Sequence, residues 1–81
     1  MGGTVVVAIW HVDERKLRWW GKEHDWYNLN EIALGLGVAP STLSRVINGK
    51  SAPGHELLAA MRFVFGEEAF ADMTAVTEVA P

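Results

Sequence analysis

The side chains best suited to chemistry are concentrated in residues 40–50, where hydroxyl, amide and cationic groups are closely spaced. Leu43, Val46 and Ile47 share one helical face, which predicts a helix over residues 40–47. The opposite face is polar and carries Ser41, Thr42, Ser44, Arg45 and Asn48. An α-helix fits the major groove of B-form DNA, where such side chains reach base edges. The pattern therefore predicts contact with double-stranded DNA.

Catalytic and metal-binding chemistry have no comparable pattern. The chain has no cysteine, and its three histidines lack the spacing of a metal site: His11, His24 and His55. The sequence contains no Ser/His/Asp arrangement, no phosphate-cradling glycine loop and no pair of catalytic carboxylates. We therefore expect a protein that is not an enzyme and that holds neither a metal nor a cofactor.

A second short helix precedes the polar one and would hold it in place. The apolar stripe that predicts this helix over residues 29–36 consists of Leu29, Ile32, Ala33 and Leu36. Asn28 is a good N-cap for it, and Gly37 supplies a left-handed turn residue after it. Pro40 presets the first φ of the next helix, which Asn48-Gly49 ends as a left-handed cap. Two short helices joined through a glycine turn form a helix-turn-helix candidate.

Residues 29–50, followed by Pro53 and by Glu56-Leu57-Leu58, resemble the phage-repressor/Cro-type (XRE-like) helix-turn-helix family. The resemblance covers roughly residues 17–73 and is densest over residues 32–53. It implies a mainly α fold, a lambda-repressor-like bundle of about four to five helices. It also implies a sequence-specific transcriptional regulator, a phage-type or bacterial repressor (Cro-like or immunity repressor) that binds a pseudo-palindromic operator as a dimer.

The resemblance also implies roles for individual residues. The family's recognition helix reads bases at the positions that hold Ser41, Thr42, Ser44 and Arg45 in this chain. Arg45 could bind the O6/N7 edge of guanine. Pro40 starts that helix, and Asn48 and Lys50 fall where the following loop meets phosphates. Asn28 falls at the N-cap of the first motif helix, whose N-terminus approaches the DNA backbone.

Two positions depart from the family pattern. Leu29 stands where the family often has a phosphate-binding glutamine, so one backbone contact is expected to be missing. Ala39 replaces the usual serine or threonine cap of the recognition helix, which costs about 1 kcal/mol of helix stability.

The rest of the chain predicts further helices and a small sheet. Helices are expected over residues 13–25 and 55–65, with one or two more turns over residues 67–73. Residues 4–10 predict a strand with two apolar faces, which could pair with residues 74–79. Because the helices can cover one face, we expect the other to contact a second copy of the chain. The residues expected in this homodimer contact are Val5, Val7, Ile9 and Trp10.

Size and charge bound the remaining possibilities. The chain has 81 residues, which suits one domain over residues 1–81 with a thin core. Its net charge is −3, but all seven basic residues lie between Arg15 and Arg62, and the acidic excess belongs to residues 63–81. Local charge decides contact with DNA, so the total does not exclude it. No apolar run is long enough to span a membrane, and we expect a soluble cytoplasmic protein.

Two features leave an alternative open. The basic run of Arg15, Lys16, Arg18 and Lys22 could be a solvated helix face or a DNA contact. The four tryptophans are expected in the core and in the dimer contact: Trp10, Trp19, Trp20 and Trp26. The tryptophans beside an apolar strand, the acidic balance and the single arginine of the recognition helix also suit a protein-interaction module on a helix-turn-helix fold, such as an antitoxin or a phage factor that binds a host protein.

Overall fold

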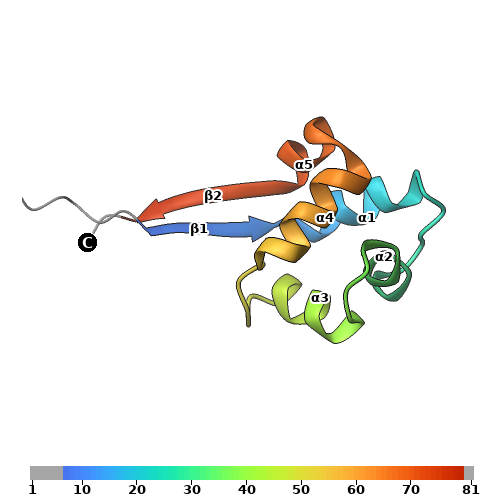
Figure 1. The fold of residues 1–81 in the computed structure, drawn as a ribbon, viewed down its shortest axis with the longest axis horizontal. Helices are drawn as coiled ribbons and strands as arrows, with labels where there is room; N and C mark the ends of the chain where they lie inside the picture. The colour runs from blue at the N-terminus through green and yellow to red at the C-terminus, as the bar shows by residue number, and fades with distance from the viewer. Residues whose placement is uncertain (1–6, 80–81) are drawn as a thin grey trace, which may run out of the picture.

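The computed structural model describes residues 7–79, in which five helices lie between two strands. The elements are β1 (Val7–Val12), α1 (Glu14–Lys22), α2 (Leu29–Leu36), α3 (Pro40–Ile47), α4 (His55–Phe65), α5 (Glu67–Met73) and β2 (Thr74–Val79). The helices gather into one body, from which the two strands project together (Figure 1). This confirms the predicted mainly α fold. None of the described helices is long and apolar enough to cross a membrane.

β1 and β2 pair in antiparallel fashion and form a two-stranded ribbon. This pairing confirms the match predicted between the N-terminal strand and residues 74–79. The predicted end of the first strand at Trp10 is wrong, because pairing continues to Val12 opposite Thr74. The Asp13 backbone N–H then donates to the Met73 carbonyl at 2.9 Å, so the ribbon continues up to the start of α1. Residues 4–6 of the predicted strand lie outside the described residues.

Short polar contacts explain where the helices begin. The Asp13 Oδ1 accepts a hydrogen bond from the Lys16 backbone N–H at 3.0 Å and caps α1. The Asn28 Oδ1 accepts one from the Glu31 N–H at 2.8 Å, which confirms the predicted cap of α2. At the start of α3 no side chain makes a cap hydrogen bond, as expected from Ala39.

Glycines with positive φ end α2 and the turn after α3. Gly37 has φ 77°, as predicted for the residue between the two motif helices. At the end of α3, Gly49 has φ 73° whereas Asn48 has φ −83°. Of the predicted Asn48-Gly49 cap, only the glycine is therefore left-handed, because it lacks the Cβ that disfavours this conformation.

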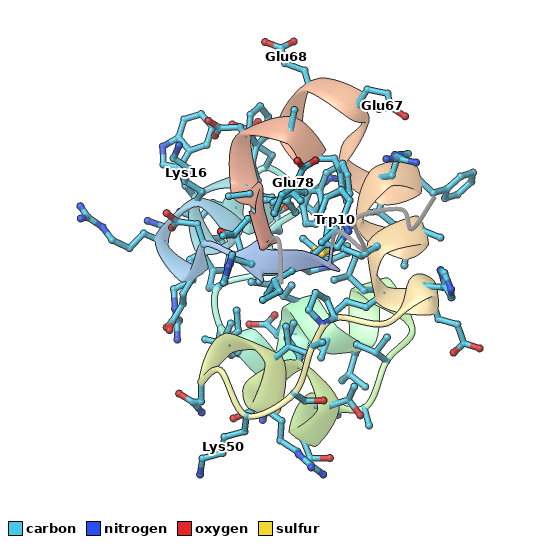
Figure 2. The ribbon with its side chains drawn as sticks, turned by 90° about the vertical axis from the view of Figure 1, so that its left-hand side faces the viewer. Trp10, Lys16, Lys50, Glu67, Glu68 and Glu78 are labelled. Atoms are coloured by element: carbon cyan, nitrogen blue, oxygen red, sulfur yellow. The ribbon has the colours of Figure 1, made fainter. Side chains whose placement is uncertain are left out.

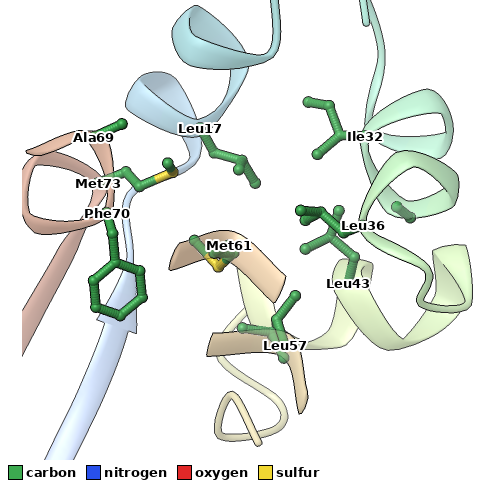
Figure 3. Close-up of a cluster of buried hydrophobic side chains, with 11 residues drawn as sticks. Leu17, Ile32, Leu36, Leu43, Leu57, Met61, Ala69, Phe70 and Met73 are labelled. Atoms are coloured by element: carbon green, nitrogen blue, oxygen red, sulfur yellow. The ribbon is translucent and has the colours of Figure 1, made fainter. Parts of the chain in front are cut away.

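The core is one cluster of eleven buried apolar side chains contributed by all five helices (Figure 3). Its members are Leu17, Ile32, Ala33, Leu36, Leu43, Val46, Leu57, Met61, Ala69, Phe70 and Met73. The α2 and α3 members are all predicted to face inward, whereas Leu29 and Ile47, predicted with them, are only half-buried against the cluster. The helix-turn-helix is thus packed through α2 onto α1 and α4, which in turn pack against α5, so it is part of a rigid body.

Two glycines inside helices mark places where the backbone approaches a neighbour. The sequence predicts only a weakened helix at Gly21, yet this residue is buried and a Cβ there would lie 2.9 Å from Ile32 Cδ1. A Cβ at Gly35 would overlap the ring of Trp26. The Trp26 ring is itself stacked on His24 at 4.7 Å between centroids. Glycine at these two positions therefore serves tertiary packing.

Candidate nucleic-acid interface

The α2–α3 unit is held at its crossing by small and buried side chains. Ala33 and Leu43 are both fully buried, and Val46 is nearly so. The turn between the helices is closed by the Val38 N–H, which donates to the Ala33 carbonyl at 2.9 Å. These contacts leave α3 little freedom to turn about its own axis. The direction of its outer face is therefore set by the core.

The outer face of α3 is polar and open to solvent. Ser41, Thr42 and Arg45 are exposed, and Ser44 is half-buried. The Asn48 Nδ2 donates to Ser44 Oγ at 3.3 Å, so these two side chains are ordered against each other. Of the residues predicted to read bases, three are thus exposed, and the fourth, Ser44, is half-buried and hydrogen-bonded to Asn48.

Positive charge on this face is uncompensated. Residues 40–50 contain two bases, Arg45 and Lys50, and no acidic residue. Neither base makes an ion pair within residues 7–79. A guanidinium in this state has all its donors available for a base edge or a phosphate.

The loop after α3 presents Lys50 at the edge of the molecule. Figure 2 shows Lys50 projecting at the end of the body where α3 lies. The Lys50 backbone N–H donates to the Arg45 carbonyl at 2.8 Å, and Gly49 supplies the positive φ that this turn needs. Lys50 and Arg45 therefore project from one continuous, hydrogen-bonded segment. Pro40, at the other end of α3, is half-buried.

Asn28 is placed differently from the rest of the predicted contacts. Its side chain is exposed, but both polar atoms are engaged by Glu31: Oδ1 by the Glu31 N–H, and Nδ2 by Glu31 Oε1 at 2.9 Å. The Glu31 carboxylate also places a negative charge at the N-terminus of α2. This charge opposes a phosphate at that position. Sequence reasoning missed the role of Glu31, although asparagine followed three residues later by glutamate is the spacing of a capping box.

The predicted dimer residues all belong to or precede β1. Val5 lies outside the described residues, and Val7 is the first residue of β1. Ile9 is 40% exposed on the ribbon. Trp10 is half-buried, with its ring centroid 5.8 Å from that of Phe70. Of the two residues whose burial the structure describes, Ile9 and Trp10, it is Ile9 that is exposed.

Comparison with known proteins gives one informative similarity. Over 39 residues, 48% of its length, the chain is 49% identical to the uncharacterized HTH-type transcriptional regulator YvzC of Bacillus subtilis (strain 168). The similarity is to a helix-turn-helix regulator. The matched segment is 51% of that protein, so the chain spans about half the length of this relative. No protein-family model matches the chain, and no solved structure matches it.

Proposed function

We propose that the protein binds double-stranded DNA in a sequence-specific manner through α3 and regulates transcription. The observation that carries this proposal is the open polar face of α3, where Arg45 and Lys50 make no ion pair with any residue of 7–79. An α-helix of this kind can enter the major groove, and its exposed side chains can reach base edges. The similarity to an HTH-type transcriptional regulator supports the same function.

Each residue of the face has a proposed part in the complex. Arg45 contacts the O6/N7 edge of a guanine, because its five donors suit bidentate recognition. Lys50 contacts a phosphate as a point charge, which adds affinity without sequence information. The residues that contact bases or phosphates through hydroxyl or amide groups are Ser41, Thr42, Ser44 and Asn48. Pro40 begins α3 at the edge of the DNA contact. Asn28 lies at the N-terminus of α2 and approaches the DNA backbone once the Glu31 carboxylate turns away from its Nδ2.

The regulator is further proposed to act as a repressor of the phage or bacterial type and to bind as a homodimer. A two-stranded ribbon is marginal in water on its own, and each of its strands has one unpaired edge. Ile9 and Val76 lie on opposite faces of the ribbon, because Ile9 is paired with Thr77 and Val76 with Trp10. The exposed apolar side chain of Ile9, 40% accessible, supports burial of its face against a second ribbon. The operator would then be a pseudo-palindrome whose half-site centres lie about one helical turn apart.

The deciding experiment is selection of the purified protein against a random duplex library at near-physiological salt. Enrichment of a two-fold symmetric site is expected. Enrichment of a single half-site would support sequence recognition by α3 and contradict the proposed dimer. A folded protein that enriches no sequence would contradict DNA recognition altogether.

One observation favours the alternative function of a protein-interaction module. Trp19 is 57% exposed on α1, although tryptophans are expected in a core. A folded protein that enriches no DNA site and forms a stable complex with another protein would favour this alternative.

A further inference from the structure

α1 carries the same pair of residue types twice, one residue apart. Lys16 and Trp20 are separated by four residues, and so are Arg15 and Trp19. Residues four apart on a helix lie on one face, so each pair presents a cation beside an indole. Because the two pairs are offset by one position, they project from α1 in directions that differ by the rotation of a single residue about the helix axis.

The Lys16–Trp20 pair binds a carboxylate within the chain. The Lys16 Nζ donates to Asp72 Oδ1 at 3.2 Å, and the Trp20 Nε1 donates to Asp72 Oδ2 at 2.9 Å. Both carboxylate oxygens of Asp72 are thereby engaged, and α5 is fastened to α1. This contact shows what a cation and an indole at this spacing on α1 can hold.

The Arg15–Trp19 pair has no such carboxylate. Arg15 makes no ion pair, and the Trp19 indole makes no hydrogen bond, within residues 7–79. Both side chains are exposed, and together with Asp13 and Lys16 they line a shallow hollow. Trp19 is also held in place, because its ring packs edge-on against Trp20 at 4.9 Å between centroids.

We propose that Arg15 and Trp19 bind a carboxylate of an acidic segment on a partner protein. The pair repeats the spacing that already holds Asp72, and Lys22 adds a further exposed positive charge one turn along. Asp13 also lines the hollow, but its Oδ1 is engaged by the Lys16 N–H. Because Lys16 is paired with Asp72, the positive charge that the partner's acid meets comes from Arg15 and Lys22.

A protein suits this surface better than DNA does. The indole of Trp19 offers a large apolar area, which a phosphate backbone cannot bury. Tryptophan and arginine are the residues most enriched at the energetic centres of protein interfaces. Figure 2 also shows Lys16 in the upper half of the view and Lys50 at its lower end, so these two lysines lie apart.

A second copy of the chain suits it less well. Two of the acids in the C-terminal part are already paired, Asp72 with Lys16 and Glu67 with Arg62. Glu68 and Glu78 lie on separate elements and form no continuous acidic segment.

The test uses the full chain labelled with ¹⁵N and two capped peptides. One peptide has two aspartates flanking a leucine, and its twin has asparagines in their place. At low salt, the acidic peptide is expected to shift the Trp19 indole and Arg15 Nε resonances saturably, whereas the twin leaves them unmoved. Arg15→Gln is expected to weaken binding of the acidic peptide by about threefold or more, which is consistent with the loss of one exposed ion pair.

A crossed control separates this surface from α3. Arg45→Gln removes the same charge from α3 and is expected to weaken binding of a short duplex while leaving the peptide unaffected. Arg15→Gln is expected to do the opposite. If no variant binds DNA, the function proposed for α3 fails, and the peptide titration still decides the role of α1.

Three results would overturn the assignment of α1. The first is an acidic peptide that leaves Arg15 and Trp19 unmoved. The second is an Arg15→Gln variant that loses duplex affinity as Arg45→Gln does, which would make α1 part of a DNA contact. The third is a Trp19 resonance that moves with protein concentration alone, which would make a second copy the occupant.

Discussion

Arg45 is an exposed guanidinium with no ion pair inside residues 7–79, so its removal disturbs little in the fold. Arg45→Ala is expected to weaken binding to the selected duplex by about 1–3 kcal/mol and to relax the preference at one base position. Lys50→Ala is the matched control, since it should weaken all duplexes alike and flatten the salt dependence by about one phosphate contact. Binding titrations against single-base variants of the site measure both effects. An unchanged affinity and base preference in Arg45→Ala would exclude the role of Arg45.

The effect of a substitution at Gly35 on stability depends on one neighbouring side chain, that of Trp26. Alanine normally stabilises a helix relative to glycine by about 1 kcal/mol. At Gly35 the new methyl group would overlap the Trp26 ring, which packs against His24 and Phe65. Gly35→Ala is therefore expected to lower the free energy of unfolding by about 1–3 kcal/mol, measured by urea denaturation. In a Trp26→Ala background the same change should stabilise the protein, and the absence of this reversal of sign would contradict the contact.

At the scale of elements, α3 begins without a side-chain cap. Ala39 has φ −66° and ψ 138°, an extended conformation that suits an N-cap, but it has no side-chain acceptor. Ala39→Ser should supply one and stabilise the protein by about 1 kcal/mol. For a domain of this size the thermal midpoint should rise by about 4–8 °C in a circular dichroism melt. Ala59→Ser, at an exposed position inside α4, should give no such rise; equal effects of the two changes would argue against capping.

The contact between α1 and α5 makes stability depend on pH. The Trp20 indole N–H and then the Lys16 ammonium hold the pKa of Asp72 below its usual range. A carboxyl whose pKa is lowered by folding stabilises the protein above its unfolded pKa, and this contribution disappears as the pH falls through the folded pKa. Asp72→Asn should therefore be less stable than the wild type at pH 7, and the difference should narrow below about pH 4.

Urea denaturation at pH 7 and pH 3 measures this narrowing. Glu68→Gln is the control. It removes a carboxylate from the same helix, and this carboxylate makes no ion pair within residues 7–79. If the difference in free energy of unfolding between the wild type and Asp72→Asn stays constant with pH, the ionised form of Asp72 does not contribute to stability.

At the scale of the whole molecule, the ribbon is the part least covered by the chain's own helices. It projects from the helical body in Figure 1, and the described residues measure 51 Å along their longest axis and 25 Å along the next. If two ribbons meet in the proposed dimer, Ile9→Lys should place charge in the contact and lower the mass measured by sedimentation equilibrium toward that of one chain. Ala71→Lys makes an equal charge change at an exposed position of α5 and should leave the mass unchanged. A wild-type protein that is monomeric at all concentrations would exclude the dimer.

Much of the fold could be predicted because its signals are local. The cap at Asn28, the positive φ of Gly37 and the proline that opens α3 each depend on a few adjacent residues. The same is true of the polar face of α3, which follows from helical periodicity alone. Contacts between residues that are not adjacent in the chain have no such signal. The packing roles of Gly21 and Gly35 therefore follow only from the structure, which places Ile32 against Gly21 and Trp26 against Gly35.

Trp19 and Trp20 mark the boundary between the two kinds of information. The sequence by itself determined the helices, the turn and the polar face, because these depend on residue types at fixed spacing. It assigned both adjacent tryptophans to packing, since nothing nearby distinguishes them. Only the tertiary structure separated them: α5 brings Asp72, 52 residues away, to the Trp20 indole, and no described element covers Trp19. The physical reason is that burial depends on which distant helix arrives, and that is settled by the packing of the whole core.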